Sequence, residues 1–343
     1  MKKLLNTLYV TTQGAYLKKE GEAILVRVEH ETRLRLPVHN LEGIVCFGNV
    51  LCSPFLLGHC AEHGVQISFL TENGRFLARV QGPVSGNVLL RRTQYRRADD
   101  PEQAADLARL FVLGKIANTR VALNRAARDR PQADGAPALR QTSAQLAQCI
   151  QSLQQATRTD QIRGVEGQAA QLYFAVFPQL ITASEPTFAF TGRNRRPPRD
   201  PVNTLLSFLY TLLAHDVQAA LEGVGLDPAV GFLHTDRPGR PSLALDLMEE
   251  LRPFLADRLA LSLLNRAQLR PADFKPEPTG GIRLSDDGRR TVLKAYQERK
   301  RDEITHPFLD EKLPVGLVPH AQALLLARHL RGDLAPYPPF SWK

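Results

Sequence analysis

Cysteine is scarce in this sequence, and its scarcity excludes a disulfide framework. The four cysteines among 343 residues are Cys46, Cys52, Cys60 and Cys149. No two of them have the Cys-x-x-Cys spacing that is common in zinc and redox sites. We therefore expect all four to be reduced residues of the core.

Long apolar runs are also missing. No uninterrupted apolar stretch reaches the length of about eighteen residues that a membrane-spanning helix needs. Residues 1–14 lack the apolar segment and the small-residue cleavage site of a secretory signal. Both absences predict a cytoplasmic protein without a membrane anchor. With 43% apolar and 23% charged residues the composition is that of a globular protein, and the length favours two domains.

Positive charge is in excess. The formal net charge is +9 and the pI is about 9.6. Because lysine and arginine bind phosphate groups and release their counterions, a nucleic acid is the expected partner. The charge alone does not distinguish DNA from RNA. The first part of the chain lacks the interleaved aromatic motif of an RNA-recognition sheet, which disfavours RNA.

Two kinds of periodicity divide the chain near residue 97. Before that point short β-type runs alternate with turn residues, which predicts a β-sheet domain over residues 1–97. The clearest runs are residues 8–11, 23–28, 66–70 and 75–80. Asn73 and Gly74 separate the last two runs, and an Asn-Gly pair is typical of a tight hairpin.

One helix is expected within this β region. Ser53 can cap its start, and Gly64 can end it. His59 and His63 lie four residues apart on this helix, but the glutamate that a zincin motif places after its first histidine is absent. We therefore expect surface or capping roles for these histidines, and no metal ion.

After residue 97 the apolar residues recur at the helical spacing, which predicts a larger all-helical domain over residues 98–343. The expected fold class is therefore α+β, with an N-terminal β-sheet domain that includes one helix. The helices are expected toward residue 128 and over residues 137–155, 160–177, 201–221, 242–264, 289–300 and 318–330. Residues 332–343 are expected either to be disordered or to lie on a neighbouring surface.

Glu166 is the first candidate for a chemical role. It lies between Gly164 and Gly167 in a segment with helical spacing. Each glycine inside a helix costs about 1 kcal/mol relative to alanine, so the pattern predicts that something approaches this backbone closely. Phosphodiester chemistry at neutral pH needs a divalent cation, and carboxylates hold such ions. The alternative is a solvated helix glutamate.

His234, Asp246 and Glu249 are the next candidates. His234 ends the short apolar run 231–234, where a core or capping histidine is the alternative. Asp246 and Glu249 are three residues apart and therefore share one face of a helix. Asp246 stands among apolar residues, so its charge needs a partner. The alternative is an amphipathic helix whose acidic edge meets water or Arg252.

A basic loop precedes the helix that Asp200 can cap. Its arginines are Arg193, Arg195, Arg196 and Arg199. Guanidinium groups in a loop stiffened by proline suit phosphate oxygens, and a solvated linker is the alternative. Lys115 and Asn118, on the long helix before it, are further candidates that could contact DNA or line an interdomain seam.

Together these motifs resemble the CRISPR-associated integrase family of spacer acquisition. The matching segments occur in the family's order around Glu166 and over residues 194–210, 231–234 and 245–250, and the resemblance runs essentially the whole length. It implies that Glu166, His234 and Glu249 are catalytic ligands of a Mn²⁺ or Mg²⁺ ion. It also implies that Asp246 is a nearby acidic residue or an alternative third ligand, and that the arginine loop faces DNA phosphates.

The same resemblance implies an activity and partners. The family cleaves DNA and inserts spacer DNA into a CRISPR array by transesterification, as part of antiviral defence. The implied partners are double-stranded DNA (spacer precursor and CRISPR repeat), a second copy of the chain that pairs through the β domain, and a small ferredoxin-like second CRISPR adaptation protein. Two other functions stay open from the residues alone: a catalytically inert DNA-binding scaffold and an RNA-binding protein.

Overall fold

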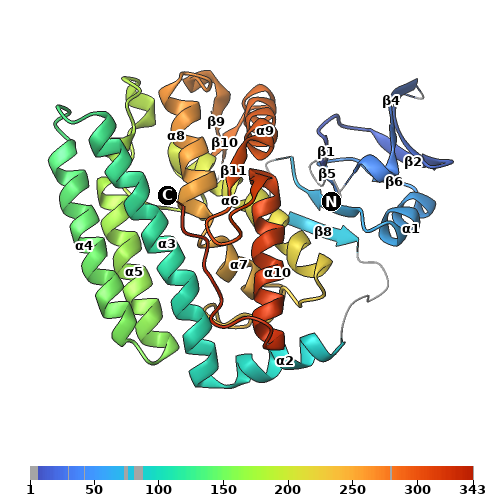
Figure 1. The fold of residues 1–343 in the computed structure, drawn as a ribbon. Coiled ribbons are helices and arrows are strands. Elements are labelled where there is room, and N and C mark those ends of the chain that lie inside the picture. The colour runs from blue at the N-terminus through green and yellow to red at the C-terminus, as the bar shows by residue number, and fades with distance from the viewer. Residues whose placement is uncertain are drawn as a thin grey trace. The chain divides into compact units, whose positions relative to one another are not determined.

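The chain folds into two compact units in the computed structural model (Figure 1), which describes residues 7–29, 31–41, 43–72, 76–80, 88–278 and 280–342. The sheet unit comprises Met1–Gly86, Tyr296–Asp302 and Pro314–Leu317, and the helical unit comprises Asn87–Ala295, Glu303–Leu313 and Val318–Lys343. The predicted α+β fold class is confirmed, because strands dominate the first unit and helices the second.

The sheet unit contains two four-stranded sheets. In the order β1-β5-β7-β8 the first three strands are parallel and β8 is antiparallel, whereas in the order β4-β3-β2-β6 only β2 and β6 are parallel. The strands are β1 (Thr7–Val10), β2 (Tyr16–Glu20), β3 (Ala23–Val28), β4 (Glu31–Pro37), β5 (Gly43–Phe47), β6 (Leu51–Cys52), β7 (Gln66–Leu70) and β8 (Phe76–Val80). The predicted pairing of β7 with β8 is confirmed, while the turn residues Asn73 and Gly74 lie outside the described residues.

Apolar residues of both sheets pack around helix α1 (Pro54–Glu62) to form the core of this unit. The predicted cap is present, because Ser53 Oγ accepts a hydrogen bond from the backbone N–H of Leu56 at 3.2 Å. Every cysteine is free, as expected from the sequence, and only Cys52 is not fully buried. The sheets and α1 therefore share one continuous core.

The helical unit follows most of the predicted segments. Its long helices are α2 (Val88–Asp99), α3 (Pro101–Asp129), α4 (Ala136–Gln155), α5 (Thr159–Val176), α6 (Pro201–Gly223), α9 (Asp286–Arg301, whose end belongs to the sheet unit) and α10 (Val318–Arg331). Figure 1 shows α3, α4 and α5 packed side by side. No helix in the described part of the chain has the length and apolarity needed to cross a membrane.

Three local predictions differ from the structure. The expected helix 242–264 is broken into α7 (Ser242–Met248), a π-helical turn (Arg252–Asp257) and α8 (Arg258–Asn265). Pro253 lies at the break, where it has no N–H to continue the α-helical hydrogen bonds. Helix α2 occupies residues that were expected to belong to the sheet region. The mostly helical unit also contains two short ribbons, β9 (Phe274–Pro276) with β10 (Ile282–Leu284) and β11 (Glu303–Thr305) with β12 (Lys312–Pro314).

The C-terminal tail lies on the helical unit, which is the second of the two predicted arrangements. Tyr337 and Phe340 are fully buried. The Tyr337 hydroxyl and the Phe340 backbone N–H donate to the Glu250 carboxylate at 2.9 and 2.7 Å. The guanidinium groups of Arg125 and Arg258 lie over the Trp342 ring, at 3.9 and 4.2 Å from its centroid. The tail is therefore part of the core of this unit.

Replacing Glu250 should detach the tail. Glu250→Ala removes the acceptor for the Tyr337 hydroxyl and the Phe340 N–H, and it leaves a cavity beside α3. We expect a loss of about 2–4 kcal/mol in the free energy of unfolding, measured by urea denaturation, together with faster proteolysis of the tail. Asp134→Ala, at an exposed position of the same unit, is the control. Equal stability of the two variants would contradict this account of the tail.

Candidate functional site

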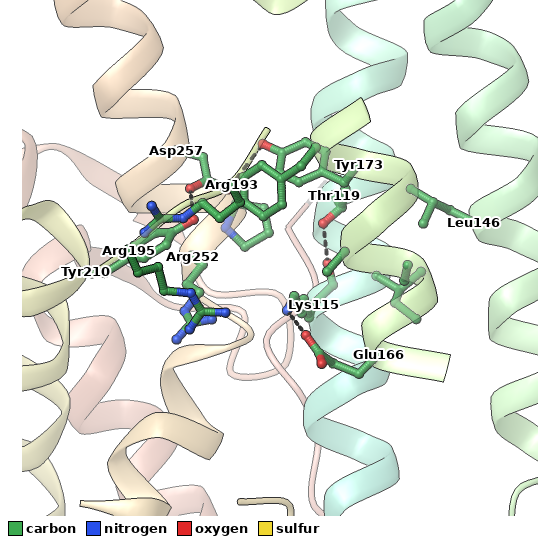
Figure 2. A pocket seen from close by; sticks show the side chains of 15 residues that line it. Lys115, Thr119, Leu146, Glu166, Tyr173, Arg193, Arg195, Tyr210, Arg252 and Asp257 are labelled. Atoms are coloured by element: carbon green, nitrogen blue, oxygen red, sulfur yellow. Dashed lines mark hydrogen bonds and ion pairs between the residues drawn. The ribbon is translucent and has the colours of Figure 1, made fainter. Parts of the chain in front are cut away.

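Lys115 of α3 joins two carboxylates that come from different elements. Its Nζ forms an ion pair with Glu166 of α5 and lies 2.7 Å from Glu249 Oε2, just after α7. Figure 2 shows Lys115 and Glu166 meeting at the edge of a pocket. The Lys115 and Glu249 side chains are only 12% and 2% exposed, so solvent screens their attraction little.

Glu249 remains ionised although it is buried. Its Oε1 lies 2.7 Å from Arg252 Nη1, the contact that the amphipathic-helix interpretation predicted. Burial raises the pKa of Glu249, but the positive charges of Arg252, Lys115 and His234 outweigh this effect and lower the pKa to about 2. Burial lowers the pKa of Lys115, but the negative charges of Glu249 and Glu166 raise this pKa by more. The pKa of Lys115 is therefore raised overall, and the ammonium stays charged.

Asp246 is fully buried and holds the loop that carries His234. Its Oδ2 accepts backbone N–H groups from Phe232 and Leu233 at 2.6 and 2.9 Å. Its Oδ1 accepts the backbone N–H of His234 at 2.9 Å and lies 2.6 Å from Nδ1 of the same ring. Both oxygens of Asp246 are therefore occupied. The Nε2 atom is the nitrogen of His234 that remains for a ligand.

Close packing explains why residue 231, at the start of this loop, is a glycine. A hydrogen bond from α5 also holds the loop. A Cβ on Gly231 would lie 2.8 Å from Asp246 Oδ2 and 2.8 Å from Ser242 Cβ, so no larger residue fits without a shift. Arg163 Nε donates to the carbonyl oxygen of Leu233 at 2.7 Å. Arg163 and Glu166 are three residues apart on α5 and share a face, so Glu166 lies on the side of α5 that meets the His234 loop.

The chemistry of the donors fits a divalent cation. The carboxylates of Glu166 and Glu249 converge on one ammonium nitrogen, which is the partner of the buried Glu249 Oε2 atom. Two carboxylates and one imidazole form a ligand set that suits Mn²⁺ or Mg²⁺. In the part of the chain that the structure describes, the ligand atoms of Glu166, Glu249 and His234 are not all within 4.8 Å of one another. Two of the three predicted ligands, Glu166 and Glu249, thus meet at Lys115, whereas His234 is held by Asp246.

The pocket beside Lys115 is rich in positive charge. Figure 2 shows that Arg193, Arg195 and Arg252 line it together with Lys115. The Arg193 guanidinium is fixed, because it donates to Asn203 Oδ1 at 2.6 Å and lies 5.4 Å from the centroid of the Tyr210 ring. Fixed guanidinium groups suit the oxygens of a phosphate. The pocket therefore has the character of an anion-binding site.

The predicted basic loop presents Arg195, Arg196 and Arg199 as exposed side chains. Asn194, which the sequence analysis missed, braces the loop by accepting the backbone N–H of Arg199 at 2.7 Å. Asp200 caps α6 as expected, because it accepts the Asn203 N–H at 2.8 Å. The three exposed arginines therefore stand on a loop whose backbone is held by side-chain hydrogen bonds.

Asn118 differs from the expectation for it. The side chain is fully buried, and its amide donates to the carbonyl oxygens of Glu250 and Phe340 at 2.7 and 2.8 Å. Its Oδ1 accepts the backbone N–H of Trp342 at 2.7 Å. With all of these groups engaged inside the helical unit, Asn118 holds the tail in place and is not available to contact a duplex.

The glycines beside Glu166 face open space. A Cβ on Gly164 or Gly167 would meet no atom of the described chain within 4 Å. The described chain itself makes no close approach to the α5 backbone there, so the expected close approach stays a prediction that another molecule would have to meet. What the two glycines provide is an uncovered strip of helix next to Glu166.

Asp257 is a buried carboxyl that the sequence analysis missed. It accepts hydrogen bonds from the hydroxyls of Tyr210 at 2.6 Å and Tyr173 at 3.1 Å, and it lines the same pocket. Burial raises its pKa from 3.8 to about 6, although both tyrosine hydroxyls and the charge of Arg252 act in the opposite direction. No local pattern marks this residue, because its partners come from α5 and α6.

Asp257 should make stability depend on pH. Because its pKa is higher in the folded state than in the unfolded state, its contribution is complete below pH 3.8 and is lost as the pH rises through about 6. Between about pH 5 and about pH 7.5 the wild type should lose about 1 kcal/mol of stability relative to Asp257→Asn. Urea denaturation at both pH values measures this, with Asp134→Asn as the exposed control. A difference that does not change with pH would contradict the shift.

Comparison with known proteins gives a consistent result. A family model described as CRISPR associated protein Cas1 matches residues 8–298. A relative from Chlorobaculum tepidum named CRISPR-associated endonuclease Cas1 1 is 59% identical over 343 residues and covers all of both chains. The structure of a Cas1 protein from Thermotoga maritima superposes with a TM-score of 0.81 at 25% identity, over 95% of this chain and 97% of that one. A chain of a partial Cas6-RT-Cas1–Cas2 complex gives a TM-score of 0.65 at 25% identity, over 98% of each chain.

Proposed function

Because the chain belongs to the Cas1 family of CRISPR-associated proteins, as its motifs predicted, we propose that it is a metal-dependent DNA endonuclease and integrase of CRISPR adaptation. The observation that carries this proposal is the convergence of Glu166 and Glu249 on one cationic nitrogen beside an arginine-lined pocket. The name of the Chlorobaculum tepidum relative supports a nuclease, and the pocket's charge supports a phosphate-bearing substrate.

Glu166, Glu249 and His234 are the residues that would hold a Mn²⁺ or Mg²⁺ ion. When bound there, a divalent ion would supply positive charge to the phosphodiester under attack. Asp246 is less suited to be a ligand, because four donors already occupy its two oxygens. Its role is that of a positioning residue, which turns the Nε2 atom of His234 away from the loop.

The chain's own residues supply the rest of the reaction. Arg195 and Arg252 line the pocket, and they bind and orient the phosphate oxygens of double-stranded DNA. Arg196 and Arg199 extend the same positive surface. The 3′ hydroxyl of a spacer precursor attacks a phosphodiester of the CRISPR repeat, forms a new P–O bond, and releases the 3′ oxygen of the cut strand. Water in place of the hydroxyl gives cleavage.

Loss of a proposed ligand should separate catalysis from binding. Glu166→Gln and His234→Ala are each expected to lower joining and cleavage of branched DNA by more than about 100-fold, because each removes a ligand. DNA affinity should change little, since the arginine loop stays intact. Activity is measured with Mn²⁺ or Mg²⁺ and affinity by fluorescence anisotropy, with Glu102→Gln as the control.

Three outcomes would overturn this assignment. Wild-type strand transfer in both variants would remove the ligand roles. Absence of ion-dependent cleavage in the unmodified protein would favour an inert DNA-binding scaffold. Preference for RNA in a competition with DNA of equal length would favour an RNA-binding protein.

The uncovered strip of α5 gives a second prediction. Gly164→Ala should raise the free energy of unfolding by about 1 kcal/mol, because alanine favours a helix and a Cβ there meets no atom of the described chain. Strand transfer should nevertheless fall several-fold if a DNA backbone approaches this strip. Gly58→Ala is the matched control, since Gly58 also lies in a helix interior with open space around it. Unchanged strand transfer in a stabilised Gly164→Ala protein would contradict the approach of DNA to this strip.

A homodimer that pairs through the N-terminal β domain, residues 1–97, is the proposed assembly, with residues 98–343 as the catalytic and DNA-binding domain. Exposed apolar side chains of the sheet unit support pairing, among them Phe55 at 84% and Leu51 at 61% exposure. The solved complex that contains both Cas1 and Cas2 supports Cas2 as the further partner, and the small ferredoxin-like second adaptation protein is the form proposed for it.

A further inference from the structure

A second cluster of metal-ligating side chains lies in the sheet unit, outside the site described above. Glu22 lies in the turn between β2 and β3, His59 lies on α1, and His63 follows the end of α1. One carboxylate oxygen and one ring nitrogen from each histidine all lie within 4.8 Å of one another. Among the residues that the structure describes, no other three side chains of ligand type come this close.

The two ring nitrogens point to the carboxylate without bonding to it. His59 Nε2 lies 3.6 Å and His63 Nε2 lies 3.9 Å from Glu22 Oε2. Both distances are too long for a hydrogen bond. Ligand atoms around a tetrahedral Zn²⁺ ion, at about 2.0–2.1 Å from the metal, lie about 3.3 Å apart. The two distances to Glu22, 3.6 and 3.9 Å, are somewhat longer than this, and all three ligand atoms lie within 4.8 Å of one another, so small side-chain movements would close the cluster on a zinc ion.

One ring nitrogen of His59 is buried and makes no hydrogen bond. Its residue is only 4% exposed, and its Nε2 atom is buried with no hydrogen-bond partner. A buried polar atom without a partner costs about 1–3 kcal/mol. This nitrogen points toward Glu22, so a ligand bound between the two residues would satisfy it.

The backbone fixes the orientation of His63. Its Nδ1 lies 2.8 Å from the carbonyl oxygen of His59. Because a carbonyl oxygen only accepts, Nδ1 carries the proton, and in the neutral ring the lone pair is on Nε2, which faces Glu22. Histidines that bind metals have this arrangement, in which the second nitrogen donates to a backbone carbonyl.

We propose that Glu22, His59 and His63 bind a Zn²⁺ ion, with water completing the coordination. Two imidazoles and one carboxylate favour zinc and similar transition metals over Mg²⁺. The ion joins α1 to the β2–β3 turn, so its role is to stabilise the sheet unit. The sequence analysis expected no metal here because the glutamate of a zincin motif is absent. That absence excludes the hydrolytic motif of the zincins, but it does not exclude a structural zinc site. A protonated His63 paired with Glu22 is the competing arrangement, and it binds no zinc.

The test is zinc binding by tag-free, full-length protein treated with a chelator. His234→Ala serves as the parent, so that zinc at the proposed catalytic site does not contribute. In this parent we expect one equivalent of Zn²⁺ after gel filtration and a rise in the melting temperature when zinc is added. Glu22→Gln and His63→Ala, at positions where folding is not at risk, should each weaken zinc binding by more than about 100-fold. Co²⁺ in place of zinc should give the visible absorption of a tetrahedral site.

His39→Ala and Glu31→Gln are the controls, because both residues are exposed in the same unit and lie outside the cluster. They should keep the bound equivalent and the rise in melting temperature. Two results would overturn the proposal: no zinc bound by the parent, or the same zinc affinity in Glu22→Gln and His63→Ala as in the parent. Either result leaves the proposed integrase activity untouched, since the two sites share no residue.

Discussion

Glu249 has to remain ionised inside the helical unit, and the side chains that make this possible also hold several elements together. Lys115 reaches it from α3 and connects it to Glu166 on α5, while Arg252 approaches from the π-helical turn. A buried charge that loses its partner costs about 3–5 kcal/mol. The arrangement of these elements and the ionisation of the site therefore depend on the same few contacts.

Asp246 is also a buried carboxylate, but its charge is stabilised by hydrogen bonds and not by ion pairs with lysine or arginine. No lysine or arginine is needed, because three backbone N–H groups and one imidazole surround its carboxylate. The carboxylate in turn gives the 231–234 loop a fixed shape that it could not keep through its own backbone bonds. Two buried carboxylates three residues apart are thus stabilised in different ways, Glu249 by ion pairs and Asp246 by hydrogen bonds.

Local patterns predicted the strands, the capped helices and the identity of Glu166, His234, Asp246 and Glu249 as residues of interest. They failed where the outcome depends on distant packing. The partner of Glu249 on α3 and the tyrosines around Asp257 come from segments far apart in sequence, which no local spacing records. Apolar periodicity continued through Pro253, so it concealed the break in that helix. The sequence did not decide whether the tail is disordered or lies on a neighbouring surface. Its main acceptor, Glu250, lies about ninety residues earlier, so no local pattern records the contact.

The way the tail completes the helical unit has a consequence for biosynthesis. Tyr337 and Phe340 leave the ribosome after every helix of the unit, yet Glu250 and Asn118 depend on them for hydrogen bonds. During translation these buried polar groups stay exposed to water, and the helices can assemble only loosely. The unit thus reaches its native packing only when the tail is in place against Glu250 and Asn118.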